Sequence, residues 1–199
     1  MKTFATKLAM TQIYNDRGEQ KAVTILNLLG SVLIGKKTVE KDGYESDIFA
    51  LVKEDTVGRK SVVGQFKKFP NIVKIKESKS GTDESLSVGS PISAKDFTVG
   101  DKLTVYTVTK GKGFAGTVKR HGFATGPKTH GSDNYRQPGS IGPTYPQRTI
   151  LGRRMGGHMG AKNIKLKNVE VVRIEAEKGR IWVKGSIPGA NKAQLILEK

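Results

Sequence analysis

The residues whose types and spacing could do chemistry gather in one stretch of the chain, from Thr107 to Lys167. Within it, Gly111–Gly116 (GKGFAG) matches the pattern G-x-G-x-x-G, which in dinucleotide-binding folds brings a pyrophosphate to a helix N-terminus. Such a fold also needs a long helix opening at the third glycine and an acid about 20 residues later. Gly122 and Pro127 do not suit a long helix, and Asp133, near the right distance, lies in a polar loop. We therefore expect glycines that let the backbone approach a phosphate chain closely, and no cofactor.

Three histidines, His121, His130 and His158, fall in the same stretch and could suggest a metal site. Their spacing matches no common ligand pattern, no carboxylate cluster accompanies them, and the chain has no cysteine. We predict no metal, and we expect histidines that stack on bases or hydrogen-bond phosphates, with solvated loop histidines as the alternative. No set of nucleophile, base and orienting group can be argued from the sequence, so no enzymatic activity is predicted.

Charge sets this basic stretch apart from the rest of the chain. It holds 12 lysines and arginines against a single acid, Asp133, and so carries +11 of the formal net charge of +17. Such a peptide cannot bury enough apolar surface to offset its ordering entropy, so it is either disordered or ordered by a polyanion. Aromatic residues that suit stacking on unpaired bases are interleaved with the cations. They are Phe114, Phe123, Tyr135 and Tyr145.

Nucleic acid is the polyanion that this pattern favours. A membrane surface would require an amphipathic helix with a coherent apolar face, which the sequence lacks. Folded RNA is favoured over duplex DNA, because no recognition-helix motif is present and an irregular segment suits irregular cavities. A nucleotide-binding enzyme and a general basic coating protein are the two alternatives.

The rest of the chain has to position this stretch, and its pattern indicates a β-rich body. Turn signals separate runs of β-forming residues at 21–29, 31–39, 44–52 and 97–106. The clearest hairpin spans 168–184, with alternating strands on both sides of a turn. The hairpin residues expected to face inward are Val172, Ile174, Ala176, Ile181 and Val183.

Between Lys53 and Ser90 the composition becomes charged and rich in serine and glycine. Val62 and Phe66 could lie on one face of a helix that Pro70 ends, and a strand could follow from residue 72. We interpret this segment as a small inserted α+β lobe, and a loosely structured linker is an equally open alternative.

We thus predict a mainly β fold with three parts. The barrel body covers 1–44, 91–106 and 168–199, the inserted lobe covers 45–90, and a long irregular basic extension covers 107–167. A sequence pI near 10.0 also indicates an anionic partner. Because no run approaches ~20 apolar residues and the N-terminus has no apolar leader, we expect a soluble, intracellular protein.

Four motifs of the basic stretch resemble, in order, the signature of the large-subunit ribosomal protein three family. They are Lys110–Arg120 (KGKGFAGTVKR), Thr129–Ser132 (THGS), Gln137–Gly142 (QPGSIG) and Gly152–Gly160 (GRRMGGHMG). Matches outside the stretch are Lys7–Tyr14 (KLAMTQIY), Thr38–Tyr44 (TVEKDGY), Phe97–Asp101 (FTVGD) and Val183–Ala190 (VKGSIPGA). The resemblance covers nearly the whole chain and is to the bacterial type.

The resemblance implies a translation-factor-like β-barrel with a small inserted lobe. It also implies a loop that enters large-subunit ribosomal RNA towards the peptidyl-transferase centre, with Gly139, Ser140, Ile141, Gly142, Pro143, Thr144, Tyr145 and Pro146 at its tip. Members are structural, bind early in assembly, contact neighbouring large-subunit proteins and reside in cytoplasmic ribosomes. They act on no small-molecule substrate and bind no membrane.

We expect the RNA contacts to come from cations and rings of the basic stretch. The predicted phosphate contacts are Lys110, Lys112, Lys119, Arg120, Lys128, Arg136, Arg148, Arg153, Arg154 and Lys162. The predicted base or RNA contacts are Phe114, His121, His130, Tyr135, Tyr145 and His158. The chain departs from the family pattern at Thr107, where many relatives have glycine, and at Pro143, where many bacterial members have a glutamine that can be methylated. We therefore do not carry this modification over.

Overall fold

The structure is a computed structural model that describes residues 1–15, 17–53, 56, 58–79 and 86–199. Residue 16 of the expected barrel body and part of the expected lobe lie outside the described residues. The chain forms two compact units. One combines Met1–Val108 with Asn163–Lys199, and the other is Thr109–Lys162, which we call the extension.

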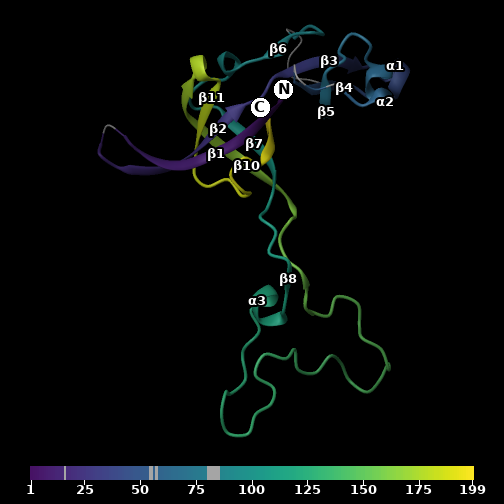
Figure 1. The fold of residues 1–199 in the computed structure, drawn as a ribbon, viewed down its shortest axis with the longest axis vertical. Helices are drawn as coiled ribbons and strands as arrows, with labels where there is room; N and C mark the ends of the chain where they lie inside the picture. The colour runs from purple at the N-terminus through teal and green to yellow at the C-terminus, as the bar shows by residue number, and fades with distance from the viewer. Residues whose placement is uncertain (16, 54–55, 57, 80–85) are drawn as a thin grey trace. The chain divides into compact units, whose positions relative to one another are not determined.

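A closed barrel of antiparallel strands forms the larger part of the first unit (Figure 1). Its strands follow one another around the barrel in the order β1-β12-β7-β10-β11-β2. They are β1 (Lys2–Tyr14), β2 (Gln20–Leu28), β7 (Lys102–Val108), β10 (Asn163–Glu175), β11 (Arg180–Lys184) and β12 (Gln194–Glu198). The expected mainly β fold is therefore confirmed, and closure leaves no strand of the barrel wall as a free edge.

Alternation along the barrel strands fills the core. In β7, Leu103 and Val105 are fully buried, while Lys102, Thr104 and Tyr106 alternate with them on the outer face. Ile181 and Val183 are buried as predicted. In β10, however, Val171 and not Val172 is the buried residue. A register shift between Val171 and Arg173 breaks the strict alternation there, and this bulge explains the difference.

A four-stranded antiparallel sheet packs beside the barrel in the same unit, in the order β5-β4-β3-β6. These strands are β3 (Ser31–Lys37), β4 (Ser46–Val52), β5 (Ile72–Lys79) and β6 (Pro91–Ile92). The short helices α1 (Val39–Asp42) and α2 (Lys60–Gln65) lie in the connections β3–β4 and β4–β5, and the 3-10 turn η1 is Ala94–Asp96.

Strand β3 therefore belongs to this sheet, although we expected residues 1–44 to lie in the barrel body. The two faces of the sheet explain this. Leu33 and Phe49 belong to the barrel core cluster, while Ile34 and Ile48 belong to a second cluster that Val62 of α2 packs against. A strand that is covered on both faces needs apolar residues at successive positions, and a barrel strand does not.

The extension contains little regular structure. Its elements are β8 (Phe114–Ala115), α3 (Thr117–His121) and β9 (Gly157–His158). Residues 122–156, all of them described, form turns and irregular backbone. Strand β7 ends one residue beyond Thr107, at Val108, and β10 begins four residues before Lys167, at Asn163. The compact unit 109–162 therefore lies within the expected extension 107–167. The last 3-10 turn, η2 (Ala176–Lys178), ends at Gly179 in the predicted hairpin.

Candidate nucleic-acid interface

The base of the extension consists of residues 110–121 and 155–160, where the outgoing and returning chains pair. Strands β8 and β9 are antiparallel, with Phe114 opposite His158. Lys112 N donates to Met159 O at 2.9 Å, and Met159 N donates to Gly113 O at 2.9 Å. At Gly160, which has φ +77°, an added Cβ would lie 2.1 Å from Lys110 O. The approach of the two chains therefore requires glycine there.

A side-chain clamp closes the same base. Arg120 Nη1 donates to Met155 O at 2.9 Å, and His121 Nε2 hydrogen-bonds the same carbonyl oxygen at 2.9 Å. The guanidinium lies so close to Gly157 that a Cβ there would be 2.5 Å from Arg120 Nη1. Both side chains are half-buried. Two residues predicted only as RNA contacts thus also fix the geometry of the extension.

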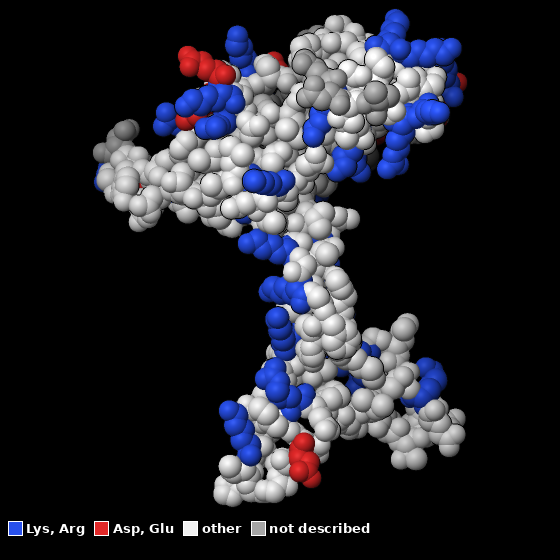
Figure 2. Space-filling model, viewed as in Figure 1, with Lys and Arg blue, Asp and Glu red and all other residues white. Residues whose placement is uncertain are grey.

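Nine of the ten predicted phosphate contacts are exposed, and Arg120 is the exception. Asp133 is the only acid in the extension, and none of the nine forms an ion pair with a residue that the structure describes. Figure 2 shows lysine and arginine side chains recurring along this segment, with almost no acidic surface among them. Arg153 Nη2 donates to Ser140 O and so links the returning chain to the predicted tip.

The side chains predicted to contact bases differ in their exposure to solvent. Phe114 and Tyr145 are 81% and 83% exposed, an unusual state for large rings. His130 and His158 are also exposed. Tyr135 is half-buried, with Lys128 Nζ 5.3 Å from the centre of its ring. The structure therefore exposes several of the predicted rings to solvent.

The predicted tip, residues 139–146, is an open loop. Gly139 has φ +72°, and the peptide bond between Tyr145 and Pro146 is cis. Just beyond it lies a feature that the sequence analysis missed: Ile150 and Leu151 are 54% and 98% exposed. The sequence alone could have indicated this feature, because two consecutive large apolar residues are unusual in a basic, glycine-rich segment.

The glycine motif at 111–116 does not build a dinucleotide site. Strand β8 has two residues and pairs with the antiparallel strand β9, whereas a dinucleotide fold needs a parallel β-α-β unit. Helix α3 follows Gly116 but ends after five residues at Gly122. Within the described residues, no group of His, Cys, Asp and Glu is suited to hold a metal, and no helix is long and apolar enough to cross a membrane.

Comparison with known proteins agrees with these features. The family model of ribosomal protein L3 matches residues 51–181. This chain belongs to the ribosomal protein L3 family. It is 40% identical over 197 residues to the large ribosomal subunit protein uL3 of Exiguobacterium sibiricum, covering 97% of this chain and 94% of that protein. The uL3 protein of Streptococcus mutans is also 40% identical, over 96% of this chain and 93% of its own length. The resemblance to the bacterial type is thus confirmed, and the family is a structural ribosomal component rather than an enzyme.

Proposed function

We propose that this protein is a structural constituent of the large ribosomal subunit whose extension binds large-subunit ribosomal RNA. One observation carries the proposal. Residues 109–162 hold ten lysines and arginines and one acid, and within this fully described segment only Ala115 and Thr117 are buried. A segment without a core keeps one shape only when a partner supplies contacts and counter-charge, and RNA supplies both.

The cations and rings have separate roles in this function. The exposed lysines and arginines neutralise phosphates and set the position of the protein on the RNA. Phe114, Tyr145 and His158 offer faces to unpaired bases. Arg120 and His121, which hold Met155 O, keep the base of the extension in the geometry that presents those groups.

The extension enters the RNA with residues 139–146 innermost, towards the peptidyl-transferase centre, as in the family that the chain belongs to. The barrel remains at the RNA surface beside neighbouring large-subunit proteins, and binding occurs early in subunit assembly. The protein works in cytoplasmic ribosomes. The exposed Ile150 and Leu151 join the tip as apolar contacts within the RNA.

The test is the affinity of the full chain for deproteinised large-subunit rRNA as salt rises. If six to ten cations contact phosphate, the affinity falls about 10³–10⁵-fold between 50 and 200 mM salt. The variant R136Q/R148Q/R154Q lowers the slope of log affinity against log salt by about 2–3. Its matched control, K60Q/K67Q/K68Q, removes the same charge from exposed positions of the other unit and leaves the slope much less changed.

Three outcomes separate the proposal from its alternatives. Affinity that is nearly independent of salt would contradict phosphate binding. Equal affinity for rRNA, DNA and anionic vesicles would indicate a general coating protein. Dinucleotide binding by the RNA-free protein, abolished by Gly113→Val, would indicate a nucleotide-binding enzyme.

A further inference from the structure

A groove in the first unit lies outside the extension and outside the predicted site. Barrel strands β1, β7, β10 and β12 form one side of it, and the edge strand β5 of the four-stranded sheet forms the other. Its volume is about 600 Å³, within the range of pockets that hold a ligand of nucleotide size. We call it the lysine groove, because Lys2, Lys74, Lys76 and Lys165 line it with one acid, Glu77.

The positive charge of the lysine groove is only partly neutralised by neighbouring acids. Glu77 is held by Lys37 at 2.9 Å and accepts a hydrogen bond from Tyr44 Oη at 2.9 Å. Glu198 pairs with Lys2 at 3.1 Å. Lys74 Nζ donates to the neutral Gln194 Oε1 at 2.9 Å. With the residues that the structure describes, Lys74, Lys76 and Lys165 form no ion pair.

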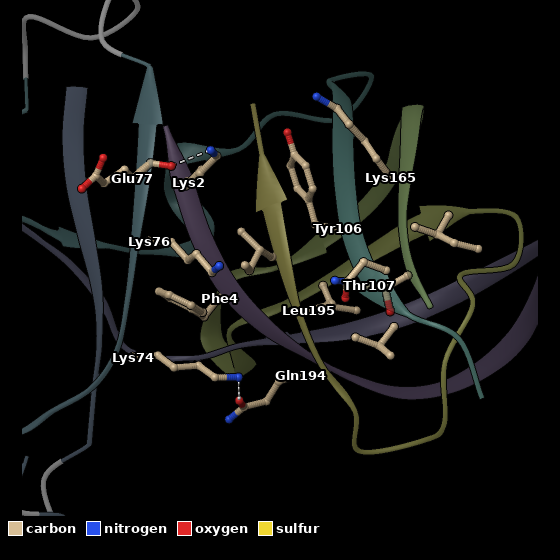
Figure 3. A pocket seen from close by; sticks show the side chains of 14 residues that line it. Lys2, Phe4, Lys74, Lys76, Glu77, Tyr106, Thr107, Lys165, Gln194 and Leu195 are labelled. Carbon is tan, nitrogen blue, oxygen red and sulfur yellow. Dashed lines mark hydrogen bonds between the residues drawn. The ribbon is translucent and has the colours of Figure 1, made fainter. Parts of the chain in front are cut away.

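The lysines are also arranged on two sides. Lys74 and Lys76 extend from β5 on one wall, and Lys165 lies beside Tyr106 on the other (Figure 3). Lys165 Nζ is 4.9 Å from the centre of the Tyr106 ring, and its hydrogen bond with Tyr106 raises the pKa of this lysine. Lys165 therefore stays charged at neutral pH, and the side chains of all three lysines line one shared space. Cations on both walls suit a chain of phosphates that runs between them.

The groove also has apolar surface close to these cations. Phe4 and Leu195 form a buried floor, and Val108 and Ile164 are 45% and 36% exposed at the rim. Val108 and Asn163 are the positions from which the chain enters and leaves the extension. A strand of the RNA bound by the extension has the right chemistry for this groove, with phosphates for the lysines and a ribose or base edge for the apolar rim.

We propose that the lysine groove is a second RNA-binding site, which takes the sugar–phosphate backbone of a single-stranded segment of RNA. The identity of that RNA as large-subunit rRNA rests on the proposed function, whereas the groove itself does not. An acidic segment of a neighbouring protein is the other occupant that the charge would accept. RNA is favoured because the extension that begins and ends at the groove is itself strongly cationic.

The first test is the variant K74Q/K76Q in the full chain, with binding to deproteinised large-subunit rRNA measured against salt. Loss of two phosphate contacts to a single strand lowers the salt slope by about 1.4 and weakens binding about tenfold near 150 mM salt. K165Q lowers the slope by about 0.7. The control K67Q/K68Q removes the same charge from exposed positions on the same lobe outside the groove. Lys74, Lys76 and Lys165 are exposed, and unchanged melting temperatures verify that the variants fold.

If K74Q/K76Q matches K67Q/K68Q while R136Q/R148Q/R154Q still weakens binding, the groove proposal is overturned and the function of the extension stands. If the extension variant also matches its control, the proposed function fails as well. The second test identifies the occupant. A benzophenone side chain placed at Val108 in reconstituted large subunits cross-links to RNA under the proposal, and a cross-link confined to another protein overturns it.

Discussion

The barrel and the extension keep their shapes by different means. The barrel buries a continuous cluster that includes Leu26, Leu103 and Leu197, each inaccessible to water. The extension has no such cluster. Its base is held by backbone pairing, by close approach at Gly160 and by the clamp on Met155 O. Hydrophobic burial is non-directional and tolerates repacking, whereas close approach and hydrogen bonding fix one geometry.

Charge separates the two regions in the same way. The first unit mixes acids with bases and forms ion pairs such as Lys2 with Glu198 and Lys199 with Asp101. The extension has one acid among its cations. A region that pairs many of its charges internally can fold alone, whereas a region of almost one sign repels itself until an anion binds. The barrel is therefore expected to fold without a partner, and under the proposed function RNA orders the extension.

The largest expected effect is the difference in the free energy of unfolding between two leucine-to-alanine variants. Leu103→Ala removes a fully buried side chain from the barrel and lowers the free energy of unfolding by about 2–5 kcal/mol. Leu151→Ala removes a side chain that is 98% exposed and changes it by less than about 0.5 kcal/mol. Urea denaturation of the RNA-free protein measures both. A cost above 1.5 kcal/mol for Leu151→Ala would mean that the extension has a core of its own.

A second prediction concerns the two glycines Gly160 and Gly139, which both have positive φ. Gly160→Ala adds a Cβ 2.1 Å from Lys110 O, so the paired chains at the base have to separate. At Gly139 nothing lies within 4 Å of an added Cβ, so Gly139→Ala brings only the left-handed strain of about 1–2 kcal/mol.

Amide hydrogen exchange distinguishes the two glycine variants. In Gly160→Ala, the amides of Lys112 and Met159 lose their protection, because they donate across the base. Amides of the barrel strands exchange as before. Equal protection in Gly160→Ala and Gly139→Ala would show that the base does not depend on close approach.

Sequence patterns predicted the barrel better than the extension, and the same physical difference explains why. Alternation marks a strand with one buried face, so the hairpin residues Ile181 and Val183 were placed correctly. Strand β1 was missed, because Lys7 lies in its buried part and donates to Ile187 O at 2.6 Å. The bulge in β10 moved the inward position from Val172 to Val171, since a bulge leaves no periodic signal.

In the candidate site, composition predicted which segment is cationic and exposed but not how its base is held. The clamp joins Arg120 to the carbonyl of Met155, 35 residues away, and any residue type offers a carbonyl. The lysine groove was missed for a related reason. Its lysines lie on strands that are remote in sequence, and only the packing of the four-stranded sheet beside the barrel brings them to one space.

The third prediction tests that clamp by proteolysis of the RNA-free protein. Trypsin cuts first in the irregular part, at Lys128, Arg136, Arg148, Arg153 or Arg154, while the barrel survives. In Arg120→Leu the hydrogen bond to Met155 O is lost, at a cost of about 1–2 kcal/mol. Opening of the base then becomes about 5- to 30-fold more frequent, and cleavage at Lys112 and Lys119 accelerates by that factor.

The control for the clamp is Arg120→Lys. Arg120→Lys keeps the charge but not the planar fork, so an intermediate rate is expected. Added rRNA protects the irregular sites in the wild type and in both variants. Unchanged cleavage at Lys112 in Arg120→Leu would show that strand pairing alone holds the base.

The smallest expected effect is the pH dependence of one ion pair in the barrel unit. Asp101 Oδ2 accepts hydrogen bonds from Lys199 Nζ at 2.7 Å and Thr98 N at 2.8 Å, and these lower the pKa of the carboxyl group. The pKa of the Asp101 carboxyl group is lower in the folded than in the unfolded state. The carboxylate therefore stabilises the fold at pH values above its unfolded pKa of about 3.9, and this contribution to stability disappears as the pH falls through the folded pKa. Asp101→Asn therefore lowers the melting temperature at pH 7, by an amount equivalent to at most about 1 kcal/mol, and the gap to the wild type closes towards pH 2.

Asp133→Asn in the extension, where the carboxylate has no described partner, serves as the control and leaves the melting temperature unchanged at both pH values. A gap for Asp101→Asn that stays constant from pH 7 to pH 2 would assign its effect to lost packing rather than to charge.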